Sequence, residues 1–172
     1  MLHVGDKIIK YDGPITREII QRYADASGDQ NPMHINEEFA VKVGLKGVIA
    51  HGLLSFGYGS RHVNDIALEN NGELLKYGCE MRGMVRPGDT IITEIEVKKI
   101  EGKRVEFDIT QNSKMPLKIE KDRVRTKTFE GEERGWVPEK ELPGVKTEET
   151  PEGIFTYREW LVNKGWATIR LK

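Results

Sequence analysis

The segment SGDQNPMHIN, residues 27–36, places a carboxylate and an imidazole five residues apart in a stretch with the composition of a loop. Pro32 fixes its own φ and disfavours a helical conformation for Asn31, so the segment can hold two side chains at a set separation. If Asp29 and His34 face one point, they can share a water molecule and remove its proton. The same cluster on its own is also typical of an ordinary turn.

Capping residues and helical periodicity flank this segment on both sides. Thr16 is a predicted N-cap of a helix that ends near Gly28, where glycine permits a left-handed conformation. Asn36 is predicted to cap a second, short helix that closes at Gly44. The segment therefore leaves one helix and enters the next.

A longer helix is predicted from HGLLSFGYGSRHVNDIALENNG, residues 51–72. Apolar side chains surround almost the whole circumference of its first half, which is typical of a helix that is buried on all sides. Three glycines in this half, Gly52, Gly57 and Gly59, are expected where the backbone of a surrounding sheet comes close. The second half becomes amphipathic and is expected to emerge into water.

After this helix the apolar residues recur at every second position. This alternation predicts antiparallel strands with one buried and one charged face over residues 91–98 and 104–109. A two-residue turn between them would mix the two faces. A three-residue loop at 101–103 is therefore expected, with Val97 opposite Phe107 and Lys98 opposite Glu106. Residues 122–129 predict a further strand. The whole pattern is α+β, an antiparallel sheet wrapped around a long central helix.

The alternation of apolar and polar residues stops at about Trp136, where a polar segment rich in proline and glutamate begins. We expect a main domain over residues 1–135 and a C-terminal extension over residues 136–172. The last part of this extension, with Trp160 and Trp166, is apolar enough to dock on another surface.

Composition restricts the function. The chain of 172 residues suits one domain, and 27 basic residues against 28 acidic ones give no general field for nucleic acid or an anionic membrane. The lone Cys79 excludes an intramolecular disulfide and a cysteine-rich zinc site. His34 and His51 have no acid or cysteine beside them at ligand spacing, so no metal is expected. No apolar run is long enough for a signal peptide or a membrane span, so a cytoplasmic protein is expected.

YADASGDQNPMHIN followed by VIAHGLLSFGYGS closely resembles the MaoC-like dehydratases, whose best-known members are (R)-specific enoyl-CoA hydratases with the hot-dog fold. The resemblance covers roughly residues 5 to 130 and includes VRPGDTI at 85–91, which is similar to the family's entry into a long strand. The elements that match the family pattern are Gly28-Asp29, Asn31-Pro32, Met33, His34, His51-Gly52 and Ser60.

The resemblance implies reversible hydration of a trans-2-enoyl thioester to the (R)-3-hydroxyacyl thioester, carried on coenzyme A or acyl carrier protein, without a cofactor. Asp29 would be the general base, and His34 would position the water and assist proton transfer. The N–H of Gly52, at the positive end of the central helix, would stabilise charge on the thioester oxygen. Ser60 would orient the Asp29 carboxylate.

Four further residues are expected to bind substrate: Asn31, His51, Leu53 and Phe56. A histidine at the position of His51 is also typical of a cap or a core residue. Arg61, Arg82 and Arg86 could meet the phosphates of coenzyme A, although solvated surface charge is the simpler interpretation. Family members pair their sheets and form acyl tunnels near the subunit boundary, which implies a homodimer.

Two other functions remain open. A hot-dog thioesterase would use Asp29 to activate water against the carbonyl, although the Asn-Pro-aliphatic-His signature argues against it. A non-catalytic or heteromeric acyl-CoA-binding subunit is the other, and the tryptophans near the C-terminus favour it. The sequence does not indicate acyl chain length, branching or the physiological direction.

Overall fold

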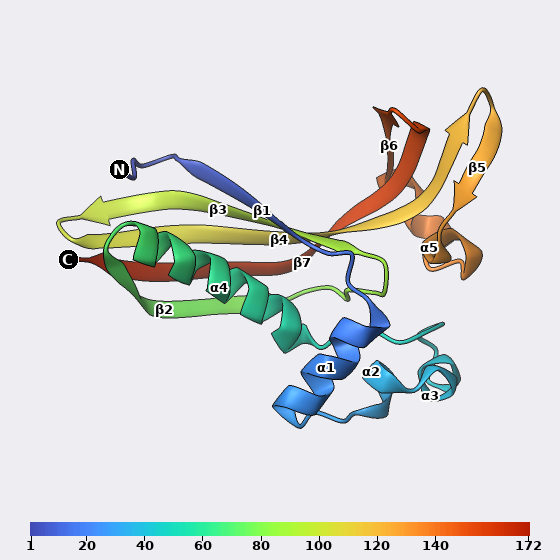
Figure 1. The fold of residues 1–172 in the computed structure, drawn as a ribbon, viewed down its shortest axis with the longest axis horizontal. Coiled ribbons are helices and arrows are strands. Elements are labelled where there is room, and N and C mark those ends of the chain that lie inside the picture. The colour runs from blue at the N-terminus through green and yellow to red at the C-terminus, as the bar shows by residue number, and fades with distance from the viewer.

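The computed structural model describes residues 1–172 and contains an antiparallel sheet with one long helix across one face (Figure 1). The strand order of the main sheet is β1-β3-β4-β7-β2. The helix is α4, Gly52–Glu69. The expected α+β architecture is confirmed. The five strands are β1 (Lys7–Asp12), β2 (Gly72–Met81), β3 (Thr90–Glu101), β4 (Arg104–Lys121) and β7 (Gly153–Leu171).

Three shorter helices precede α4 and position the loop of interest: α1 (Arg17–Ser27), α2 (Pro32–Ile35) and α3 (Glu37–Lys42). The predicted caps are confirmed. The Thr16 side chain accepts the Ile19 N–H, and Gly28 ends α1 in the left-handed region at φ 77°. Asn36 accepts the Phe39 N–H at 2.9 Å. The one-turn helix α2 lies inside the predicted loop, where Pro32 begins it.

The main core lies between α4 and the sheet. Val63 and Ile66 of α4 pack against strand residues that point to the same face, among them Phe107, Ile109 and Ile169. The alternation seen in β3 and β4 follows from this contact, because every second residue faces the helix.

The prediction that the first half of the central helix is buried on all sides is wrong for a single chain, whereas its second half emerges into water as expected. Leu53 is 56% exposed, Leu68 is 61% exposed, and Gly57 is exposed. The sheet covers only one side of α4, so the other apolar side has no partner within the chain.

The β3–β4 hairpin has the predicted faces but a different turn. Val97 lies opposite Phe107, as expected, but Lys99 and not Lys98 lies opposite Glu106. Glu101 pairs with Arg104, so the turn has two residues and not three. A bulge at Lys98 inserts one extra residue into β3, and this restores the matching of the two faces that a tight turn alone would break.

The division at residue 135 is wrong. Strand β7 pairs with both β4 and β2 in the middle of the sheet, so the last twenty residues complete the domain. Val162, Ala167 and Ile169 are buried in the core. The pattern of this strand was weak because Gly165 and the half-exposed Trp166 interrupt the alternation of apolar side chains.

Residues 116–158 form what we call the outer lobe. Figure 1 shows β4 and β7 running past the body of the sheet into this lobe. There β5 (Val124–Thr128), which confirms the strand predicted at 122–129, pairs with β4, and β6 (Val145–Thr150) pairs with β7. The lobe also holds α5 (Glu130–Glu133) and the 3-10 helix η1 (Glu139–Gly144). None of the helices in the chain has both the length and the apolar character needed to cross a membrane.

Candidate active site

The backbone around Asp29 is held at three points. Its N–H donates to the Ser27 hydroxyl at 3.2 Å, and its carbonyl oxygen accepts a hydrogen bond from His51 Nε2 at 3.0 Å. One carboxylate oxygen accepts the Asn31 N–H at 3.2 Å. The other oxygen has no protein partner, and the residue is exposed. The loop therefore fixes the main chain and leaves a carboxylate oxygen available.

His34 is held in one tautomer by its neighbour in the next loop. Its Nδ1 lies 2.8 Å from the Ile49 carbonyl oxygen. A carbonyl can only accept, so Nδ1 carries the proton and Nε2 carries the lone pair. Burial is the main cause that lowers the pKa of His34, and the nearby His51 lowers it further. At neutral pH the ring is therefore a neutral acceptor.

His51 occupies the N-cap position of α4 and is only 2% exposed. Its ring stacks on His34, with centroids 3.8 Å apart, and Tyr23 lies on it at 4.9 Å. Because Nε2 donates to the Asp29 carbonyl oxygen, this buried ring joins the loop to the start of the helix. The alternative interpretation of His51 as a core residue is supported, and its ring offers little surface to a ligand.

The N-terminus of α4 has no side-chain cap. The first N–H groups of a helix have no intrahelical partner, so those of Gly52 and Leu53 remain available, and the helix dipole makes this end positive. A Cβ atom at Gly52 would overlap the thioether of Met81. Any larger residue at this position would require the flexible Met81 side chain to move.

Two buried amides, which the sequence analysis missed, hold the first turn of α4 to the sheet. Gln111 Nε2 donates to the Ser55 carbonyl oxygen at 3.0 Å and to Thr93 Oγ1 at 3.0 Å. Asn163 Nδ2 donates to the Ser55 hydroxyl at 2.9 Å and to Gln111 Oε1 at 2.8 Å. The sequence does indicate Gln111, because it is a polar residue at an inward position of an alternating strand. It does not indicate Asn163, because β7 was not recognised.

The other predicted site residues lie further along α4 or serve the fold. Ser60 forms no hydrogen bond with Asp29, so its predicted orienting role has no contact to support it in a single chain. Phe56 packs edge-on against Tyr77 at 4.8 Å. Leu53 lies on the open side of α4, and the Asn31 side-chain oxygen caps α2 by accepting the Met33 N–H.

The three arginines considered for coenzyme A each have a partner within the chain. Arg61 pairs with the buried Asp12 at 2.6 Å, and Arg82 pairs with Glu80. Arg86 donates to the Leu45 carbonyl oxygen at 2.8 Å. Arg61 and Arg82 therefore remain largely exposed charges with a carboxylate partner, and phosphate binding by the three arginines stays a prediction.

Asp29, His34 and His51 offer ligand atoms that all lie within 4.8 Å of one another. The lone pair of an imidazole lies in the plane of its ring, and the two rings are stacked with only 30° between their planes. Stacked rings cannot both direct a lone pair at one ion. A single water can instead bridge the Asp29 carboxylate and the His34 imidazole, since two hydrogen bonds of about 2.8 Å span the distance between these two groups.

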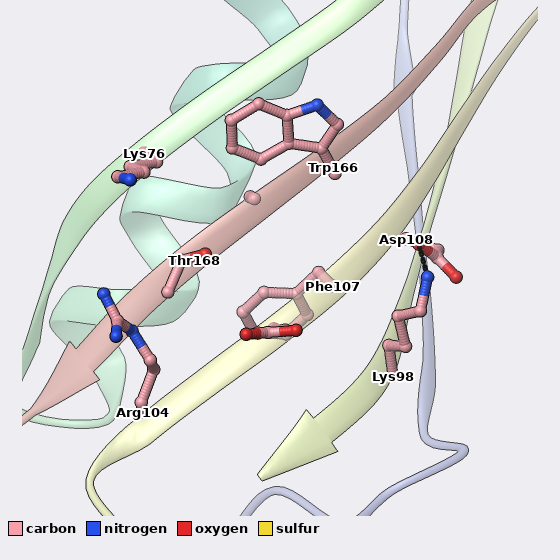
Figure 2. Close-up of a pocket in the computed structure, with 9 residues that line it drawn as sticks. Lys76, Lys98, Arg104, Phe107, Asp108, Trp166 and Thr168 are labelled. Atoms are coloured by element: carbon pink, nitrogen blue, oxygen red, sulfur yellow. Dashed lines mark hydrogen bonds and ion pairs between the residues drawn. The ribbon is translucent and has the colours of Figure 1, made fainter. Parts of the chain in front are cut away.

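The surface has a cavity beside the site and another on the opposite face of the sheet. One of about 340 Å³ is lined by His34 together with Arg17 and Val48, beside the short helices. Another, of about 390 Å³, lies on the face of the sheet away from α4, with Trp166, Lys76 and Arg104 around it (Figure 2). None of the predicted site residues lines this second cavity.

The strand order and the single helix across the sheet define a hot-dog domain. The family described as "MaoC like domain" matches residues 3–115, which is more than half of the chain. The chain belongs to this family.

Relatives and solved structures agree with this assignment. The chain is 38% identical over 82 residues to the mouse peroxisomal multifunctional enzyme type 2, and this covers 47% of the chain and 11% of that protein. It is 32% identical over 69 residues to enoyl-CoA hydratase ChsH3 of Mycobacterium tuberculosis, covering 40% of the chain and 24% of that protein. The chain thus matches a quarter or less of the length of these relatives.

Among solved structures, R-hydratase PhaJ1 from Pseudomonas aeruginosa superposes with a TM-score of 0.66 at 21% identity, covering 99% of this chain and 82% of that chain. The (R)-hydratase from A. caviae gives a TM-score of 0.63 at 18% identity, covering 99% and 98%. At these identities the likeness concerns the fold, and it confirms the expected hot-dog architecture.

Proposed function

We propose that this protein catalyses the reversible hydration of trans-2-enoyl-CoA thioesters to (R)-3-hydroxyacyl-CoA thioesters. The observation that carries the proposal is the approach of the Asp29 carboxylate and the His34 imidazole to within 4.8 Å beside the uncapped end of α4. Membership of the family supports it, as do relatives and neighbours named as enoyl-CoA hydratase and R-hydratase.

The tautomer of His34 suggests how the water is oriented. Asp29 offers a free carboxylate oxygen and His34 offers the lone pair of Nε2, so a bound water donates one hydrogen to each acceptor. Its own lone pair then faces the β-carbon of the enoyl group. As the C–O bond forms, Asp29 takes one proton from the water and then delivers it to the α-carbon, so that water adds across the double bond and the enzyme returns to its starting protonation state.

The first turn of α4 stabilises the charge that develops on the thioester oxygen. The N–H of Gly52 points out of the helix end, and the sheet holds this turn through Gln111 and Asn163. Because these donors are fixed before the reaction, they require no reorganisation as the charge appears. Loss of one such donor typically raises the barrier by about 2.7–4 kcal/mol.

A second copy of the chain is the proposed partner. The open side of α4 exposes Leu53 and Leu68, and β2 pairs only with β7, so its other edge is unpaired. Apolar side chains and a free strand edge both favour association. A covered α4 would also provide walls for an acyl chain. One similar structure, with a TM-score of 0.62, is titled as the ChsH1-ChsH2 complex, so pairing with a different subunit is the alternative. A cytoplasmic location stays a prediction.

Turnover of crotonyl-CoA tests the activity. We expect loss of the enoyl absorbance and formation of the (R)-product on chiral analysis. His34→Ala should lower kcat by about 10²-fold or more, because it removes one acceptor of the water. His3→Ala, at an exposed histidine, is the matched control and should retain full activity.

Two results would contradict the proposal. Release of free coenzyme A, followed with a thiol reagent, would identify a thioesterase. No turnover of any enoyl-CoA in a panel of different chain lengths would favour a non-catalytic or heteromeric subunit. Gel filtration with an activity assay on the same fractions would show whether activity follows the dimer.

A further inference from the structure

The loop at residues 43–50 joins α3 to α4 and carries the carbonyl group that holds His34. The Ile49 carbonyl oxygen accepts the His34 Nδ1–H at 2.8 Å, and the Ile49 N–H donates to the Met33 carbonyl oxygen at 3.3 Å. The orientation of the His34 ring therefore depends on where this loop places Ile49.

The same loop is held in an unfavourable backbone conformation. Gly44 and Gly47 have φ of 89° and 147°, and Lys46 between them has φ of 58°. Glycine accepts such angles readily, but lysine does not. A non-glycine residue stays in this region only when its surroundings hold it there.

Residues of the outer lobe hold Lys46 in this conformation. Trp136 Nε1–H donates to the Lys46 carbonyl oxygen at 3.0 Å, and Lys46 Nζ donates in return to the Gly135 carbonyl oxygen at 3.0 Å. Arg134 donates to the Lys46 carbonyl oxygen at 3.3 Å. A Cβ atom at Gly47 would lie 3.0 Å from the indole, so the loop rests directly on the ring.

The lobe itself is fastened in place. Trp136 is buried and packs against Met115 and Leu117 at the base of the lobe. A network of ion pairs joins the lobe to the helices on either side of the Asp29–His34 segment. Glu130 of α5 and Arg134, which follows α5, pair with Arg17 of α1 and Glu37 of α3. These contacts tie the lobe to both helices that flank the catalytic loop.

We propose that Trp136 is a positioning residue for His34, acting through Lys46 and Ile49. The inference rests on the proposed function. Only Gly47 and Val48 lie between Lys46 and Ile49, so a hydrogen bond to the Lys46 carbonyl oxygen restrains the position of Ile49. The family match ends at residue 115, and Trp136 lies beyond it, so this support comes from a part of the chain that the family description does not cover.

Trp136→Phe tests the proposal because it keeps an aromatic ring in the buried site while it removes the N–H donor and part of the ring surface against Gly47. We expect kcat for crotonyl-CoA hydration to fall by about 3- to 10-fold, since displacement of a catalytic group lowers the rate steeply. KM should change by less than about two-fold, because His34 orients the water and not the thioester.

Trp160→Phe is the matched control. Trp160 packs against the same small core, but its indole N–H forms no hydrogen bond with the loop. Its kcat should stay within about two-fold of the wild type. An unchanged kcat in Trp136→Phe, or an equal fall in Trp160→Phe, would overturn the proposal.

A second readout does not depend on turnover. The His34 Nδ1 proton gives a distinct signal in ¹⁵N-labelled protein, and its exchange with water reports the hydrogen bond to Ile49. Exchange should accelerate in Trp136→Phe and remain unchanged in Trp160→Phe. Unchanged exchange in Trp136→Phe would reject the positioning role, whereas an inactive wild type with accelerated exchange in this variant would reject only the proposed function.

If Trp136→Phe fails to fold, Arg134→Gln should show the same changes in kcat and in exchange at smaller size. No change in either quantity would count against the proposal.

Discussion

Two Gly-Asp steps in this molecule both place their glycine in the left-handed region, and they differ in the burial of the aspartate that follows. Gly28 and Gly88 both have left-handed backbones, at φ 77° and 91°, with open space around them. In each turn the aspartate that follows accepts a nearby backbone N–H, from Asn31 at 3.2 Å and from Arg86 at 2.9 Å. The dipeptide therefore provides a left-handed glycine and a side-chain-to-backbone hydrogen bond in both places, at the end of α1 and in the loop before β3.

The environments then separate the two carboxyl groups. Asp29 is exposed in the candidate active site, whereas Asp89 is fully buried. One oxygen of Asp89 accepts the Ser113 hydroxyl at 2.7 Å, and the other has no partner. Burial raises the pKa of Asp89 to about 7. The comparison shows that local sequence makes the turn, and that tertiary burial decides whether its carboxyl group is available for chemistry.

Replacing each aspartate by asparagine should give the largest difference in activity between the two turns. Asp29→Asn removes the general base and should lower kcat for crotonyl-CoA hydration by about 10²- to 10⁴-fold, while the thermal midpoint stays almost unchanged. Asp89→Asn should keep most of the activity, because this residue is fully buried and does not line the cavity beside His34. Steady-state kinetics and thermal unfolding of both variants measure this. A similar loss of activity in both would mean that the two turns contribute in the same way.

The pH dependence of stability provides the next effect. An aspartate in the unfolded chain loses its proton near pH 3.9, whereas buried Asp89 retains its proton up to about pH 7. Between these values the unfolded state loses a proton that the folded state retains, so stability falls as pH rises and levels off above about pH 7. At about 1.36 kcal/mol per pKa unit the loss from this residue is up to about 4 kcal/mol.

Urea unfolding at pH 5 and pH 8 tests this dependence. In Asp89→Asn the stability should depend less on pH than in the wild type. In Asp29→Asn the pH dependence of stability should be the same as in the wild type. A slope that survives in Asp89→Asn would show that other groups are responsible.

The smallest expected effect comes from the two glycines. Gly28→Ala and Gly88→Ala each place an L-residue in the left-handed region, which costs about 1–2 kcal/mol. No neighbouring atom lies within 4 Å of either added Cβ, so the two losses should be equal. Only Gly28→Ala should also lower kcat, since it precedes the general base. Unequal urea midpoints would show that the turns are not equivalent.

Much of the fold near the site could be predicted from short-range patterns. Thr16, Gly28 and Asn36 act within three or four residues of their own positions, so their capping roles are visible in the sequence. The alternation in β3 and β4 is visible for the same reason, and so is the spacing of Asp29 and His34 around Pro32. The place of β7 in the middle of the sheet was not predictable in this way, because its pairing with β4 joins residues about fifty positions apart and its glycine and exposed tryptophan obscure the period.

The sequence by itself determined where helices begin and end, which strand faces are apolar, and which two side chains flank the Asn-Pro step. Only the tertiary structure decided that α4 has an open side, that Gln111 and Asn163 hold its first turn, and that Trp136 supports the loop behind His34. Caps and periodicity act between neighbours along the chain, whereas burial, hydrogen bonds across the sheet and the tautomer of a histidine depend on residues that only folding brings together.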